Sequence, residues 1–128
     1  MDVERLKRID LFEDLPAEQL EKLAGVVNAW SKERGETLIK RGDSSFQLFA
    51  IEYGAVEVCS KEEMLATLGV GQVVGEIGVA KRGLRKASVE ATQAAGGFFL
   101  TNSQVEMVRR EAPDFEQKLQ SLVERRGF

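Results

Sequence analysis

Apolar residues recur at helical spacing near the start of the chain. Leu20, Leu23 and Val27 fall on one face of a helix. Pro16 suits the first position of that helix, because its ring fixes φ near the helical value and its missing N–H would have no partner there. The spacing predicts helix within residues 3–28, and we assign residues 1–28 to a helical N-terminal part.

Between residues 29 and 101 the pattern changes to short alternating runs. Val56 and Val58 alternate with Ala55 and Glu57, which is the period of a half-buried strand. Residues 61–63 are polar and typical of a hairpin tip. Turn-forming glycines recur at intervals that suggest a barrel or sandwich. They are Gly35, Gly42, Gly54, Gly69, Gly71, Gly83, Gly96 and Gly97.

Residues 103–127 return to helical spacing. Val105 and Val108 fit one face, and Pro113 interrupts the run. A second amphipathic helix then carries the apolar residues Phe115, Leu119, Leu122 and Val123. We therefore predict an α+β fold: a β-roll, or jelly-roll-like double-stranded barrel, flanked by N- and C-terminal helices.

Composition agrees with one domain over residues 1–128, since this length can bury a core of its own. The net charge of −3 argues against a polyanion-binding protein as a whole. No apolar run approaches the ~20 residues of a membrane span, and residues 1–5 lack the apolar core of a signal peptide. We expect a cytoplasmic protein without membrane contact, in which Cys59 is a buried filler.

The chain contains no histidine. This excludes Ser-His-Asp and Cys-His catalysis and leaves no imidazole for a metal. The sequence also offers no candidate nucleophile with an adjacent base, so we do not expect an enzyme. We expect no metal site and no cofactor.

The candidate chemistry lies in the sequence from Gly75 to Val89. Gly75 has no Cβ and lets backbone approach a ligand closely. The turn after Glu76 would point free N–H groups at an anion. Arg85 offers a planar fork for two phosphate oxygens, and Glu76 can accept a hydrogen bond from a sugar hydroxyl. These residue types predict a pocket for a small phosphate that carries a sugar.

Simpler interpretations exist for the same residues. Glu76 and Arg85 could form an ordinary surface salt bridge, which would contribute little. The basic residues Lys81, Arg82, Arg85 and Lys86 could be a solvated loop rather than a positive funnel for an anion. Nucleic-acid binding is disfavoured, because this stretch has no aromatic residue for base stacking.

The order of motifs along the chain resembles the cyclic nucleotide-binding domain family, which includes the sensor domains of the catabolite activator protein and of kinase regulatory subunits. The motifs are residues 11–15, 35–39, 41–43, 48–51, 54–58 and 65–72, followed by Gly75 and Glu76. In that family a Gly-Glu pair with an Arg nine residues after the Glu forms the phosphate-binding cassette, which here would be residues 75–89. The ligand-binding residues that the resemblance implies are Gly75, Glu76, Ile77, Gly78, Val79, Arg85, Lys86, Ala87, Val58, Leu65 and Val74.

The resemblance implies a role for each part of the site. Glu76 would accept the ribose 2′-OH, and Arg85 would clamp the cyclic phosphate with help from backbone N–H groups of residues 77–79. Val58 and Leu65 would form an apolar floor for sugar and base. The sequence departs from the family at two positions. Val74 replaces a Phe, and Lys86 stands where the family usually has Ser, Thr or Ala.

The implied function is a non-enzymatic sensor and regulatory domain for a cyclic nucleotide, with cAMP ahead of cGMP because Lys86 is not Ser or Thr. Residues 103–127 would fold over the ligand as a lid and pass a conformational signal to an effector protein or within a homodimer. The chain ends at Phe128, so no helix-turn-helix for direct nucleic-acid contact is expected. The alternative is a degenerate fold kept as a protein-interaction or dimerisation module without nucleotide, which Lys86 and the short lid favour.

Overall fold

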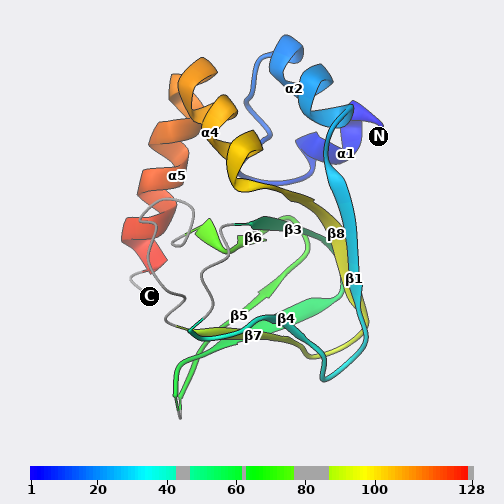
Figure 1. Cartoon of the computed structure of the whole chain (residues 1–128), viewed down its shortest axis with the longest axis vertical. Helices are drawn as coiled ribbons and strands as arrows, with labels where there is room; N and C mark the ends of the chain where they lie inside the picture. Colours follow the sequence, from blue (N-terminus) through cyan, green and yellow to red (C-terminus); the bar gives the residue numbers. More distant parts are fainter. Residues whose placement is uncertain (43–46, 62, 77–86, 127–128) are drawn as a thin grey trace.

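Two antiparallel sheets face each other, and helices from both ends of the chain pack against one of them in the computed structural model (Figure 1). The structure describes residues 1–42, 47–61, 63–76 and 87–126. Within these residues each sheet has four strands. The predicted α+β class, a β-roll between terminal helices, is confirmed.

The strand order of the two sheets places distant segments side by side. The first sheet has the order β1 (Asn28–Lys32), β8 (Ala95–Leu100), β3 (Leu48–Tyr53) and β6 (Val73–Val74). The second sheet has the order β2 (Thr37–Ile39), β7 (Ser88–Ala91), β4 (Ala55–Cys59) and β5 (Met64–Gly69). Each sheet therefore joins strands from the beginning and the end of the roll.

The N-terminal part differs from the continuous helical segment expected for residues 3–28. It contains α1 (Val3–Lys7) and α2 (Ala17–Ala24), and β1 already begins at Asn28. Between the helices the backbone makes successive short turns, in which Ile9 N donates to Leu6 O and Phe12 N donates to Ile9 O. The turns are favoured because they direct the apolar side chains of this connection into the core.

The helical C-terminal part begins and ends within one residue of the predicted range 103–127. It consists of α4 (Asn102–Glu111) and α5 (Pro113–Arg126). Thr101 and Gln104 form a capping box, in which the Gln104 side chain accepts from Thr101 N at 2.9 Å. Pro113 ends the first helix as expected and is itself the first residue of the next one, where a missing N–H costs nothing.

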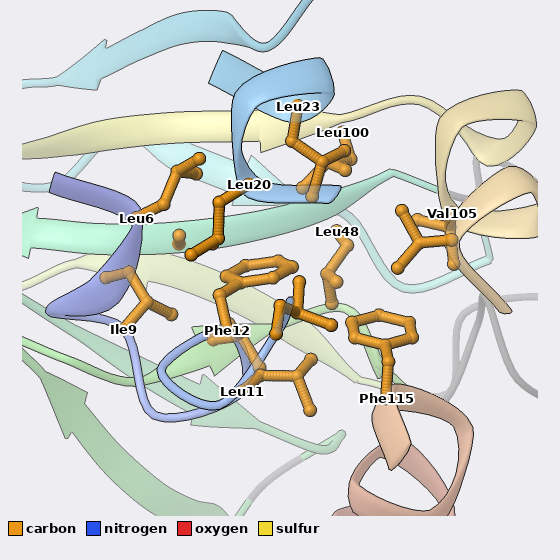
Figure 2. Packing of buried hydrophobic residues seen from close by; sticks show 14 of the residues in the cluster. Leu6, Ile9, Leu11, Phe12, Leu20, Leu23, Leu48, Leu100, Val105 and Phe115 are labelled. Carbon is orange, nitrogen blue, oxygen red and sulfur yellow. The ribbon is translucent and has the colours of Figure 1, made fainter. Parts of the chain in front are cut away.

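Strand β3 separates two apolar clusters and is buried on both faces. One face contributes Leu48 and Ala50 to a helical core, which Figure 2 shows between the helices and the sheet. The other face contributes Phe49 and Ile51 to a roll interior. The helical core consists of Leu6, Ile9, Leu11, Phe12, Leu15, Leu20, Leu23, Ala24, Leu48, Ala50, Val73, Phe98, Leu100, Val105, Val108, Ala112, Phe115 and Leu119. The roll interior consists of Trp30, Ile39, Phe49, Ile51, Val56, Val58, Leu68, Val74, Val89, Ala91 and Ala95.

The predicted alternation in β4 is confirmed, with Val56 and Val58 buried. The same alternation turns Cys59 to the opposite face with Glu57, so the expectation of a buried Cys59 is wrong. Its thiol is half-buried and lies 3.4 Å from Glu57 Oε1. Partial burial and this carboxylate raise the pKa of the Cys59 thiol.

None of the helices in the described part of the chain is long and apolar enough to cross a membrane.

Candidate functional site

The candidate site begins where β6 ends. Val73 and Val74 pair with Ala50 and Phe49 of β3, which fixes the end of the strand in the first sheet. Gly75 follows with φ of 95°, in the left-handed region that glycine adopts without strain. This turn directs the next side chain, Glu76, into the protein, where only 2% of the residue is exposed.

Glu76 lies against the end of the last helix. Its Oε2 is 2.9 Å from Nη1 of Arg126, whose side chain is only 10% exposed. The carboxylate is buried, so the interpretation as an ordinary surface salt bridge does not hold for it. A buried carboxylate is costly unless a cation or hydrogen bonds compensate it, and Arg126 supplies the cation.

The contact leaves part of the carboxylate unsatisfied. Nη1 of Arg126 donates its hydrogen bond to the Val73 carbonyl oxygen, 2.5 Å away. Among the described residues, Glu76 Oε2 has no hydrogen-bond partner, because the approach of Nη1 to 2.9 Å is an ion pair without hydrogen-bond geometry. Buried acceptors of this kind are rare in folded proteins. The arrangement can accept a hydrogen bond from a hydroxyl that enters the site.

Four of the predicted apolar site residues come together at the roll interior. Val58 and Val74 belong to it and are 2% and 3% exposed. Leu65 and Ala87 are partly buried and pack against it. Val58 also pairs with Val89 across β4 and β7, so the chain returns to this cluster at the end of the predicted cassette. Val58 and Leu65, the two residues predicted for the apolar floor, therefore lie in or against one cluster, and their contact with a ligand stays a prediction.

The remaining predicted site residues lie outside the described residues. They are Ile77, Gly78, Val79, Arg85 and Lys86. The two ends of this segment are anchored in different sheets, with β6 in the first and β7 in the second. The phosphate clamp by Arg85 and the backbone N–H groups stays a prediction.

Arg126 is a site residue that the sequence reasoning missed. The signal was its spacing: Leu119, Val123 and Arg126 are separated by four and three residues and fall on one helix face. Leu119 and Val123 are buried. An arginine that continues a buried apolar stripe needs a partner of opposite charge. The sequence pattern could therefore have indicated a buried acidic residue.

A second set of contacts holds the first turns of α5. Arg109 of α4 donates from Nε to Glu116 Oε2 at 2.5 Å and from Nη2 to Glu116 Oε1 at 2.9 Å. These hydrogen bonds from the guanidinium hold the pKa of the Glu116 carboxyl below its usual range. Lys118 donates to the backbone oxygen of Asp10 at 2.7 Å. The start of α5 is therefore tied to α4 and to the N-terminal segment.

A cavity of about 260 Å³ lies beside α5, from Lys118 to the last turn. Asp10, Leu11, Gln72 and Val73 line one side, and Lys118, Leu122, Arg125 and Arg126 line the other. Arg126 therefore both lines this cavity and forms the ion pair with Glu76.

Comparison with known proteins identifies relatives of this arrangement. The family model of the cyclic nucleotide-binding domain matches residues 30–121. A Rhodopseudomonas palustris protein whose name assigns it to the potassium channels is 30% identical over 122 residues, which are 93% of this chain and 30% of that protein. The cGMP-dependent protein kinase egl-4 of Caenorhabditis elegans is 24% identical over 80% of this chain and 13% of its own length. The chain therefore spans less than a third of these curated relatives.

Solved structures share the fold. The catabolite activator protein of Thermus thermophilus has a TM-score of 0.80 and 25% identity, over 91% of this chain and 57% of that one. The regulatory domain of Toxoplasma gondii PKA, crystallised with cAMP, has a TM-score of 0.76 and 22% identity, over 83% of this chain and 44% of that one.

Proposed function

Since the chain belongs to the cyclic nucleotide-binding domain family, we propose that it is a non-enzymatic sensor that binds a cyclic nucleotide, cAMP in preference to cGMP. Binding shifts the position of the last helix and so passes a signal to a partner, either an effector protein or a second copy. The carboxylate of Glu76 carries this proposal.

Glu76 has the properties that a sugar-binding carboxylate needs. It is buried, a cation balances its charge, and its Oε2 lacks a hydrogen bond among the described residues. A ribose hydroxyl donates one hydrogen bond and carries no charge, so it would satisfy the oxygen without further cost. A phosphate would be repelled by the same carboxylate. We therefore assign Glu76 to the ribose 2′-OH.

The phosphate is assigned to Arg85 and to the backbone N–H groups of residues 77–79. The support is the spacing of nine residues between Glu76 and Arg85, which matches the cassette of the family. A guanidinium can hold two phosphate oxygens at once. Val58, Leu65, Val74 and Ala87 supply apolar surface for the sugar and base, because they form or border the roll interior.

Sequence supports cAMP over cGMP. Ser or Thr directly after the arginine is the usual hint toward cGMP in the family, and this chain has Lys86 there. The names of the relatives do not distinguish the two nucleotides, because one is a cGMP-dependent kinase and another was crystallised with cAMP. The proposed preference for cAMP therefore rests on Lys86.

Calorimetric titration of the protein with cAMP, cGMP and 2′-deoxy-cAMP tests the proposal. We expect cAMP to bind best and Glu76→Gln to weaken cAMP roughly 10- to 150-fold, the range for a hydrogen bond to a charged group. The same change should matter far less for 2′-deoxy-cAMP. Glu90→Gln, on the exposed face of β7, is the matched control and should leave every affinity unchanged.

A thermal melt separates the proposal from the alternative of an interaction module with an empty pocket. A cyclic nucleotide at 100 times its Kd stabilises the folded state by about 2.7 kcal/mol. A panel of cyclic mono- and dinucleotides that produces no shift would overturn the proposed function and favour the interaction module.

A further inference from the structure

We propose that Arg126 is a positioning residue for the sugar-binding carboxylate, and that it couples this carboxylate to the last turn of α5. The sugar-binding part rests on the proposed function. The contact between Arg126 and Glu76 belongs to the protein alone and can be tested without any ligand.

Arg126 reaches the site because the helix presents one continuous inward face. Leu119 is fully buried and Val123 is 5% exposed, and Arg126 follows on the same face. Its guanidinium is held at two points, by the hydrogen bond to the Val73 carbonyl and by the ion pair with Glu76. A guanidinium fixed in this way fixes the carboxylate in turn, which orients the open acceptor of Oε2 before a ligand arrives.

The sugar and Arg126 need not compete. An ionised carboxylate has two oxygens with about four lone-pair sites and can accept several hydrogen bonds at once. Oε2 has no hydrogen-bond partner among the described residues, so it is available for a hydroxyl. A hydrogen bond to an ionised carboxylate is stronger than one between neutral groups. The geometry therefore predicts that Arg126 helps the ribose bind.

The two halves of α5 are held in different ways. The first half is fixed by Phe115 and Leu119 in the helical core and by the contacts of Glu116 with Arg109. The second half also has core contacts, since Val123 is buried and Leu122 packs against the helical core, but it borders the cavity at Leu122 and Arg125. Among the described residues, the polar contacts of its last turn with the β-roll come from Arg126. The last turn thus depends on Glu76 more than the rest of the helix does.

Coupling between two sites is reciprocal. If Arg126 improves the binding of a ribose by positioning Glu76, then a bound ribose must tighten the contact between Glu76 and Arg126. The last turn of α5 would then register whether the site is occupied, while the first half of the helix stays fixed in the core.

Arg126→Ala is the direct test, and Arg125→Ala is its matched control. The two residues are neighbours in the last turn and carry the same charge, but Arg125 is exposed. We expect Arg126→Ala to weaken cAMP roughly tenfold or more and 2′-deoxy-cAMP much less. Arg125→Ala should leave both affinities within about threefold of wild type, and Arg126→Lys should restore part of the loss because it keeps the cation. Equal losses for cAMP and its 2′-deoxy analogue, or no loss, would overturn the positioning role while the proposed function stands.

A double-mutant cycle on the ligand-free protein tests the contact itself. Glu76→Gln, Arg126→Ala and the double variant are unfolded with denaturant. Each single variant leaves a buried group without its partner, so the double variant should be less destabilised than the sum of the two. Additive effects would overturn the coupling. If the wild-type protein bound no cyclic nucleotide, both the proposed function and the role of Arg126 in sugar binding would fail. Non-additive effects in the double-mutant cycle would still establish the contact between Glu76 and Arg126.

Discussion

Phe12 and Phe115 stack nearly parallel in the helical core, with ring centroids 5.7 Å apart and an interplanar angle of 16° (Figure 2). Both residues are fully buried. Phe12 belongs to the turns between α1 and α2, and Phe115 to the first turns of α5. This pair makes the beginning of the last helix part of the same core as the N-terminus, so we expect a ligand to move only the later turns of α5.

The stack predicts a large loss of stability for Phe115→Ala. Removal of a buried Phe costs about 3–5 kcal/mol, because its transfer free energy is lost and a cavity remains. Gln117→Ala, on the exposed side of the same helix, is the control and should stay within about 0.5 kcal/mol of wild type. Urea unfolding of both variants measures the difference. A loss below 1 kcal/mol for Phe115→Ala would show that α5 is not anchored in the core.

Hydrogen exchange should reveal the two halves of α5. Without ligand, we expect the amides of residues 116–120 to be protected and those of residues 123–126 to exchange sooner, because the later turns border the cavity. Addition of cAMP should slow exchange in the last turn. Equal protection along the helix, with and without ligand, would contradict movement confined to its end.

The pair of Arg109 and Glu116 predicts a pH dependence of stability. Its hydrogen bonds lower the pKa of Glu116 in the folded state, so the pair stabilises the protein above the unfolded pKa of Glu, about 4.3. This contribution is lost as the pH falls through the lower folded pKa. The unfolding free energies of wild type and Glu116→Gln should therefore differ by about 1 kcal/mol at pH 7 and converge as the pH falls below the unfolded pKa and through the lower folded pKa.

Denaturant unfolding across this pH range is the measurement. The control is Glu124→Gln, on an exposed position of the same helix. It should track wild type at every pH. A constant difference between wild type and Glu116→Gln down to the lowest pH would mean that the ion pair does not supply the stabilisation.

Gly97 allows the close approach of β8 to β3. A Cβ at this position would lie 2.1 Å from the backbone oxygen of Ala50, far inside contact distance. We expect Gly97→Ala to destabilise the protein by roughly 3 kcal/mol, the upper part of the range for overpacking. Gly25→Ala is the control, since the nearest atom would be 3.6 Å away. A similar melting temperature for the two variants would contradict the packing of these strands.

Arg85→Ala tests the phosphate clamp. Loss of one partner of a buried charge pair costs roughly 2–5 kcal/mol, which is about 30-fold to several-thousand-fold in affinity. The folding stability without nucleotide should stay near that of wild type, because the residue is assigned to the ligand and not to the core. Unchanged affinity for cAMP in calorimetry would remove Arg85 from the site.

Much of this fold was predictable because its signals are local. The alternation of Val56 and Val58 and the helical spacing of Val105 and Val108 predicted their elements, and the structure confirms them. Gly75 was singled out only as a place where backbone can approach a ligand, and the structure adds that its left-handed φ turns the chain before Glu76. The segment over residues 3–28 was harder, since apolar residues that reach the core through turns have nearly the spacing of a helix.

The sequence by itself determined the fold class and the succession of a helical, a strand-rich and a second helical part, because periodicity and turn chemistry act over a few neighbouring residues. Only the tertiary structure decided that Glu76 is buried and that its cation comes from Arg126 at the end of α5. Arg126 and the Val73 carbonyl that orients it are 53 residues apart. No local pattern encodes such a contact, because the packing of α5 against β6 brings the two segments together.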